Sequence, residues 1–295
     1  LQNLFFATLN TKQENRKLRR FTDCSERIYM YIEKDIQRGY NIFTELDKND
    51  GEGSLMEVAL LIMEDGDEYT FYEEDKEVSW VLMKGKATVE VDGKVQDIER
   101  PDPFDYVGAC LLMSKGSTCK IKASAYSELY VQKTYNDRVF DPHIYSEKDT
   151  DTWARGTGNE LDGMMRRDVR TYYDYEIRPD SNMVLGEVVN QAGKWSSYPP
   201  HYHPQPEVYF YFFQREEGFG AGWADGKPYE LRNHGCLIIT DNYPHQQVMA
   251  PGYPCCYIWG IRHLDGNPWE KTRIDDPTHE WLLEENPEYW RPSEK

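Results

Sequence analysis

Short strand-like segments separated by turn residues dominate the chain, and they indicate an all-β fold. Between residues 54 and 135 these segments follow one another closely: MEVALLIM, EVSWVLM, KATVEV, KVQDIE, STCKIKAS and ELYVQKTY. The turn signals between them include Lys84-Gly85 and the hairpin pair Asp92-Gly93. The same pattern of short strand-like segments returns after residue 171, in NMVLGEVVN, EVYFYFF, CLIIT and CCYIWGIRH. Many short strands at this spacing predict antiparallel barrels or sandwiches.

A polar stretch, residues 136–170, divides the two β-rich parts and is predicted to be a long connection. The two parts are similar in size, which indicates a duplicated barrel. The predicted organisation is an N-terminal arm (1–53), a first barrel (54–135), the linker (136–170), a second barrel (171–270) and a tail (271–295). The arm is compatible with a helix or a strand, and the tail is expected to hold a short helix around Glu280–Glu285.

The balance of 34 basic and 52 acidic residues gives a net charge of −18. Nucleic acids and anionic membrane surfaces would repel such a chain, so we expect neither as a partner. No apolar run approaches the roughly 18 residues of a membrane span. At the N-terminus the charges follow the short apolar part, the wrong order for a signal peptide. The six cysteines form no CxxC pair, and we expect reduced thiols in a cytoplasmic protein.

The stretch HYHPQPEVYFYF (201–212) contains several residues that could bind a metal or take part in a reaction. His201, His203 and Glu207 are separated by even numbers, so on an extended strand all three point to one face. Tyr209 and Tyr211 share that face, while Val208, Phe210 and Phe212 take the other. Pro204 and Pro206 interrupt the hydrogen-bond ladder between the histidines and the glutamate.

Two imidazoles and a carboxylate suit one divalent ion, with Zn or Mn first and Fe or Ni as alternatives. A histidine pair in a loop also occurs by chance, but the in-phase Glu207 strengthens the interpretation. A further ligand is expected from a later strand, and His245 follows the apolar segment CLIIT. His201, His203, Glu207 and His245 are therefore the predicted metal ligands. No histidine precedes His143, so the first barrel cannot hold a histidine-based site.

This pattern resembles the two motifs of the cupins. WSSYPPH (195–201), ARGTGN (154–159) and DPTHEWLL (276–283) are similar to the 5-deoxy-glucuronate isomerases of inositol catabolism. EVYFYF (207–212) and YIWG (257–260) are more similar to the 5-keto-4-deoxyuronate isomerases of pectin breakdown. The resemblance implies a bicupin, with two double-stranded β-helix barrels. It departs from the family pattern at Phe212, where an arginine is expected, and at Asp241 and Tyr243 before His245.

The resemblance implies a metal-dependent aldose–ketose isomerase that acts on a deoxy-uronate. Such a reaction needs a cation to bind the substrate carboxylate and a group to move a proton between neighbouring carbons. The candidates for the carboxylate are Arg155, Arg167, Arg170, Lys194 and Arg262. The candidates for the proton are Glu207, Tyr209, Tyr211 and Tyr253. Each arginine or lysine also fits a solvated surface charge, and each tyrosine also fits core packing.

Three other functions are compatible with the same residues: the pectin-pathway isomerase, a metal-dependent oxygenase, and a sugar-acid-binding module without catalysis. In each case the partner is a small sugar acid. A homo-oligomer that pairs through exposed sheet edges is also expected.

Overall fold

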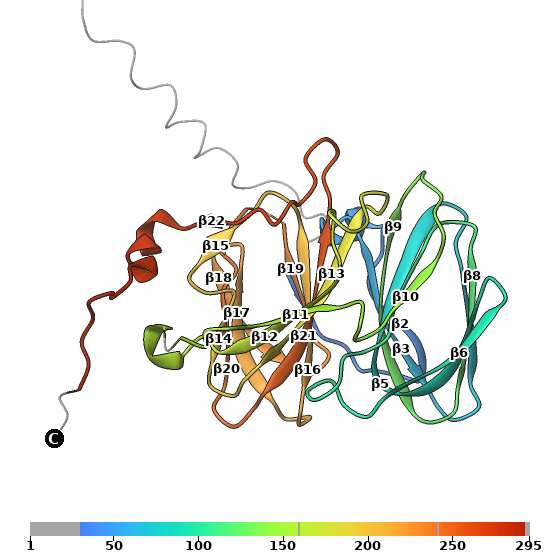
Figure 1. Cartoon of the computed structure of the whole chain (residues 1–295), viewed down its shortest axis with the longest axis horizontal. Coiled ribbons are helices and arrows are strands. Elements are labelled where there is room, and N and C mark those ends of the chain that lie inside the picture. Colours follow the sequence, from blue (N-terminus) through green and yellow to red (C-terminus); the bar gives the residue numbers. More distant parts are fainter. Residues whose placement is uncertain (1–29, 159, 241, 293–295) are drawn as a thin grey trace, which may run out of the picture.

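The computed structural model describes residues 30–158, 160–240 and 242–292. Two β-rich lobes lie side by side, one built mainly from the first half of the chain and one from the second (Figure 1). All strand pairs within the lobes are antiparallel, which confirms the all-β prediction. In this part of the chain no helix is both long enough and apolar enough to cross a membrane.

The N-terminal lobe is one curved sheet folded onto itself. Its main face runs, in spatial order, through β10 (His143–Tyr145), β7 (Cys110–Met113), β5 (Lys76–Val91), β9 (Ser127–Tyr135), β3 (Glu57–Met63) and β2 (Gly39–Thr44). The second half of β5 continues into the other face, where it pairs with β6 (Lys94–Arg100) and β8 (Thr118–Ala123), and β8 pairs with β4 (Glu68–Tyr72). A short helical turn, α1 (Asn49–Glu52), connects β2 to β3.

The C-terminal lobe has a seven-stranded face and a smaller one. The larger face is ordered β1 (Tyr31–Ile32), β19 (Cys236–Ile239), β16 (Glu207–Phe213), β21 (Cys255–Arg262), β13 (Met183–Asn190), β12 (Arg167–Tyr173) and β11 (Asp151–Arg155). The smaller face is β14 (Trp195–Ser196), β20 (Gln247–Met249), β17 (Phe219–Ala224) and β18 (Lys227–Arg232). A separate pair joins β15 (His201–Tyr202) to β22 (Ile274–Asp275), and two 3₁₀ turns are η2 (Glu160–Gly163) and η3 (Pro277–Leu283).

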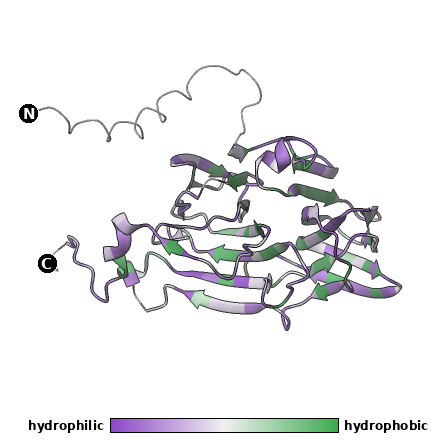
Figure 2. Cartoon of the chain, turned by 90° about the horizontal axis from the view of Figure 1, so that it is seen from above, coloured by the Kyte–Doolittle hydropathy of each residue, from purple (hydrophilic) through white to green (hydrophobic). Residues whose placement is uncertain are grey.

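Three apolar clusters hold these layers together. One fills the N-terminal lobe, one lies inside the C-terminal lobe, and the third lies between the two large sheets. The strands carry most of the hydrophobic residues (Figure 2). In the third cluster the rings of Phe43 and Phe210 meet edge to face, with their centroids 4.8 Å apart. The lobes therefore share a core, and each depends on the other for burial of one sheet face.

A buried ionic network also crosses the interface between the lobes. Glu187 on β13 accepts hydrogen bonds from Arg100 of the N-terminal lobe and from Arg170 on β12, at 2.6 and 2.8 Å. The Arg100 and Glu187 side chains have no exposed surface. Arg170 is thus a structural residue, because its guanidinium is engaged by Glu187 and by the carbonyl oxygens of Pro103, Phe104 and Tyr106.

Several local predictions can be compared with the structure. Asp92 and Gly93 form the predicted hairpin turn between β5 and β6. The predicted turn at Lys84-Gly85 is wrong, because β5 continues through both residues. There the pairing register shifts and Gly85 adopts a φ of 121°, so the strand bends from one face of the lobe to the other.

The stretches expected as arm and linker contribute strands to both lobes. Within 30–53, β1 joins the C-terminal sheet and β2 joins the N-terminal sheet, while residues 1–29 lie outside the described residues. Within 136–170, β10 pairs with β7, and β11 pairs with β12. The described cysteines, Cys110, Cys119, Cys236, Cys255 and Cys256, are free and buried, and Cys24 lies outside the described residues.

Candidate metal centre

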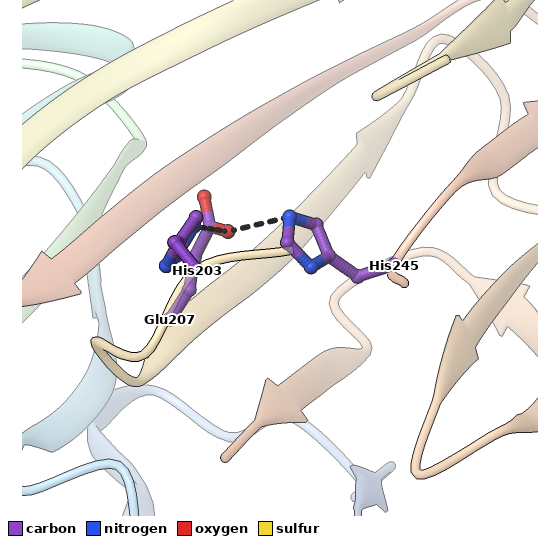
Figure 3. Close-up of side chains that lie close together, drawn as sticks. All are labelled: His203, Glu207 and His245. Atoms are coloured by element: carbon purple, nitrogen blue, oxygen red, sulfur yellow. Dashed lines mark hydrogen bonds and ion pairs between the residues drawn. The ribbon is translucent and has the colours of Figure 1, made fainter. Parts of the chain in front are cut away.

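Three of the four predicted metal ligands meet inside the C-terminal lobe. Glu207 is the first residue of β16, His203 lies in the loop just before it, and His245 precedes β20. One ligand atom from each residue lies within 4.8 Å of the others, and all three side chains are buried. Figure 3 shows the Glu207 carboxylate between the two imidazole rings. We refer to His203, Glu207 and His245 as the triad.

Backbone carbonyl groups set the orientation of both triad imidazoles. Nδ1 of His203 lies 2.9 Å from the carbonyl oxygen of Gln205, and Nδ1 of His245 lies 3.1 Å from that of Tyr243. A carbonyl oxygen only accepts, so each Nδ1 carries the proton and each Nε2 presents a lone pair. These two Nε2 atoms lie 3.2 and 3.4 Å from Oε2 of Glu207.

The triad is therefore a set of acceptor atoms that face one another. Burial lowers the pKa of His245 to about 3, and the Glu207 charge only partly opposes this, so His245 is neutral near pH 7. Its buried Nε2 has no hydrogen-bond donor among the described residues. Two imidazole lone pairs and a carboxylate in one buried position are the donor set of a divalent cation. The residues of the triad thus fit a metal ion.

His201 stands one ring away from the triad. Its ring centroid is 4.8 Å from that of His245. Its Nδ1 lies 3.1 Å from the carbonyl oxygen of Pro199 and 2.9 Å from Nη1 of Arg273. Only one of these contacts is a hydrogen bond at a time, because the first needs a proton on Nδ1 and the second a lone pair. Burial, followed by the charge of Arg273, lowers the pKa of His201 to about 3.

A cavity of about 790 Å³ opens onto the triad and is lined by the C-terminal lobe and its tail. Among the predicted carboxylate-binding residues, Arg155 and Arg167 line it. Arg167 is held by a hydrogen bond from Nη1 to the carbonyl oxygen of Met165, at 2.7 Å. The guanidinium of Arg155 stacks on Trp153, 3.6 Å from the ring centroid.

The other carboxylate-binding candidates lie elsewhere. Arg170 faces away from the cavity because side chains alternate along β12, and Arg167 is three residues earlier on the opposite face. Arg262 donates from Nε to Oγ1 of Thr134 in the N-terminal lobe, at 2.9 Å. Lys194 is not part of the cavity wall in the described chain.

Of the three tyrosines predicted as candidates for proton transfer, one lines the cavity and two do not. Tyr209 lines the cavity, and its hydroxyl lies 2.9 Å from Oγ of Ser197. Tyr211 faces the same side of β16 but lies deeper, in the apolar cluster inside the lobe. This confirms the predicted alternation, since Val208, Phe210 and Phe212 belong to the cluster between the lobes. Tyr253 packs on Phe219 and does not line the cavity.

Much of the cavity wall was not predicted from the sequence, including Tyr257, Lys271 and Arg273. Tyr257 on β21 bonds through its hydroxyl to Ser196 and lines the cavity beside Tyr209, with 5.2 Å between their ring centroids. Arg273 comes from the tail, just before β22. An alternating strand pattern in YIWG could have indicated Tyr257, but the sequence near Arg273 contains no comparable signal.

Comparison with models of protein families shows the family to which the chain belongs. The model of the KduI/IolB family matches residues 30–282. The chain belongs to the KduI/IolB family. A relative named 5-deoxy-glucuronate isomerase from Bacillus subtilis subsp. natto is 25% identical over 275 residues, which cover 85% of this chain and 96% of the relative. A second relative of the same name, from Geobacillus thermodenitrificans, is 24% identical over 71% of this chain and 80% of its own length.

Solved structures show the same fold. An IolB-like protein from Salmonella typhimurium aligns with a TM-score of 0.75 at 19% identity, over 86% of this chain and 99% of that one. The oxalate decarboxylase of Lactobacillus farciminis aligns with a TM-score of 0.57 at 12% identity, over 84% and 87%. The chain is thus a bicupin, as the sequence resemblance implied, and its relatives are isomerases.

Proposed function

We propose that the protein is a metal-dependent aldose–ketose isomerase that converts 5-deoxy-D-glucuronate into 5-dehydro-2-deoxy-D-gluconate. The observation that carries this proposal is the buried triad at a cavity whose wall also presents guanidinium groups. The triad suits a cation next to a carbonyl group, and the guanidinium groups suit the carboxylate of the same molecule. The names of the curated relatives support this substrate.

When bound, a divalent ion would polarise the carbonyl oxygen of the sugar and stabilise the enediolate. His203, Glu207 and His245 would hold it. Burial raises the pKa values of Tyr209 and Tyr257, so both hydroxyl groups stay protonated near pH 7. They are suited to donate hydrogen bonds to oxygen atoms of the substrate, and Ser197 and Ser196 fix their positions.

The test is turnover of 5-deoxy-D-glucuronate by the purified protein, followed by NMR of the ketose product. We expect conversion that a chelator abolishes and that added Mn or Zn restores. Fe and Ni are tested in parallel, since imidazole and carboxylate ligands suit them as well. Absence of conversion in every metal-loaded sample would contradict the proposal.

The 5-keto-4-deoxyuronate of pectin breakdown serves as the competing substrate in the same assay, because EVYFYF and YIWG resemble the isomerases that use it. Preference for this uronate would keep the reaction class and change the substrate. Binding of either uronate without turnover would indicate a sugar-acid-binding module instead.

A further inference from the structure

Three arginines from separate parts of the chain converge on the wall of the cavity. Arg155 lies at the end of β11, Arg167 at the start of β12, and Arg273 just before β22. The chain as a whole has a net charge of −18, so this gathering of positive charge is a local feature. Cavity walls that carry guanidinium groups attract anions, and a planar carboxylate matches their geometry.

Arg167 lacks a counter-ion in the described part of the chain. Its side chain is largely enclosed, its hydrogen bond goes to a backbone carbonyl, and it forms no ion pair with a described residue. Burial lowers the pKa of Arg167, and the charges of Arg155 and Arg273 lower it further. An enclosed cation without an anion costs free energy, so this position favours a ligand that brings a negative charge.

Arg273 is placed beside the triad by the tail. Strand β22 pairs with β15, which sets Asp275 opposite His201. Nη1 of Arg273 lies 2.9 Å from Nδ1 of His201, Nη2 lies 3.0 Å from the carbonyl oxygen of Pro199, and Nε lies 2.8 Å from Oδ1 of Asp275. Arg273 thus connects the cavity wall to the loop that carries the predicted metal ligands.

The Arg273 guanidinium lines the same cavity as both other arginines. Burial is the main cause of the lowered pKa values of Arg155, Arg167 and His201, and the charge of Arg273 lowers all three further. Asp275 is the carboxylate paired with this group in the described chain. The cavity wall also carries other carboxylates, but Asp174 and Glu176 pair with Lys271, and neither Asp151 nor Glu160 forms an ion pair with the three arginines in the described chain.

We infer that Arg273 is a specificity-determining residue that, with Arg167, binds the carboxylate of the sugar acid. The inference rests on the proposed function in one respect, that the ligand of the cavity is a uronate. The guanidinium of Arg273 carries five N–H donors, some of which are used by His201, Pro199 and Asp275, and its attachment to β15 fixes the position of the remaining donors relative to the triad. Acids are thereby favoured over neutral sugars of the same size.

The inference is tested by calorimetry on the metal-loaded protein, with D-glucuronate as the acidic probe and D-glucose as the neutral one. We expect Arg273→Gln to weaken glucuronate binding at least about tenfold, and Arg273→Lys to weaken it less. Arg291→Gln removes a charge from the same tail, where Arg291 pairs with Asp162 outside the cavity wall. This control is expected to bind both probes as the wild type does.

The metal content of each variant is measured alongside. Glucuronate binding by Arg273→Gln that equals the wild-type value would overturn the inference, and so would equal affinity of the wild type for glucuronate and glucose. Loss of bound metal in both Arg273 variants would also overturn it, since Arg273 would then act through His201.

Turnover separates this inference from the proposed function. In an active enzyme Arg273→Gln is expected to raise KM for the uronate about tenfold or more and to change kcat less. If the wild type binds glucuronate through Arg273 but converts no uronate, the inference stands and the proposed isomerase activity fails.

Discussion

The two lobes have the same architecture but opposite interiors. Inside the N-terminal lobe, β5 presents Val78, Trp80 and Leu82, which belong to a closed apolar cluster. Inside the C-terminal lobe, the corresponding central strand β16 presents Glu207 and Tyr209 to a cavity. The fold therefore supplies two equivalent interiors, and the side chains on one face of one strand decide whether an interior is filled by packing or holds a site.

Glu77 of the N-terminal lobe and Glu207 of the C-terminal lobe show a second difference between the lobes. Glu77 stands near the start of β5, as Glu207 stands at the start of β16, but it faces the other lobe. There it accepts hydrogen bonds from Asn136 Nδ2, Ser181 Oγ and the backbone N–H of Asn182. Because side chains alternate between the two faces of a strand, a shift of one residue moves a carboxylate from the interior of its lobe to the interface between the lobes.

The largest effect on turnover is expected when a residue of the triad, which only the C-terminal lobe contains, is removed. We expect His203→Ala to lose bound metal and to reduce turnover by more than about a hundredfold, because the metal then keeps only two of the triad's ligands. Metal analysis and the NMR assay measure both quantities. His143→Ala, which removes an exposed histidine from the N-terminal sheet, is the control. Intact turnover in metal-free His203→Ala protein would contradict the assignment.

The next effect concerns the connection between the lobes. We expect Glu187→Ala to lower the free energy of unfolding by about 3 to 5 kcal/mol, because it leaves the Arg100 and Arg170 charges buried without a partner. Chemical denaturation measures this quantity. Glu230→Ala removes a carboxylate from an exposed pair with Arg232 and is expected to change stability little. Equal effects of the two substitutions would show that the network adds nothing.

A smaller effect depends on pH. Burial raises the pKa of Glu77 to about 7, against a usual value near 4.5. The folded state therefore holds this proton more tightly, so the associated stability is present below pH 4.5 and is lost as pH rises through 7. We expect the unfolding free energy of the wild type, relative to Glu77→Gln, to fall by up to about 3 kcal/mol across this range. A pH-independent difference would mean that Glu77 is ionised in the fold.

The smallest effect on turnover is expected at Tyr211, which shares one face of β16 with Tyr209. The hydroxyl of Tyr211 is buried and has no hydrogen-bond partner among the described residues. We expect Tyr211→Phe to leave turnover within about twofold and stability unchanged or raised by up to about 1 kcal/mol. Tyr209→Phe is the contrasting variant, and its turnover should fall further. A larger loss of turnover in Tyr211→Phe would place Tyr211 in the chemistry.

Local patterns made much of this molecule predictable. Alternation along EVYFYFF assigned the two faces of β16. The even spacing of His201, His203 and Glu207 does not describe one strand face, because β15 ends at Tyr202, β16 begins at Glu207, and His201 lies outside the triad. The alternation of side chains along β12 likewise separates Arg167 from Arg170, the two carboxylate-binding candidates on that strand. Where the chain alternates regularly, the period of two residues carries the information.

The remaining features depend on pairs of segments that are distant in sequence and have weak signals of their own. Strands β15 and β22 are two residues long each, and their pairing brings Arg273 to His201. Strand β1 is equally short and crosses to the sheet of the other lobe. Such short strands exist because tertiary packing holds them, and no propensity of two residues could predict their partners.

The shared core between the lobes has an evolutionary consequence. The lobe without a histidine site cannot be lost by deletion, because its partner would then expose an aromatic sheet face around Phe210. Selection for activity in one half of the gene therefore also acts on the other half. Phe43 and Phe210, whose rings meet across the boundary, are expected to change together as the family diverges.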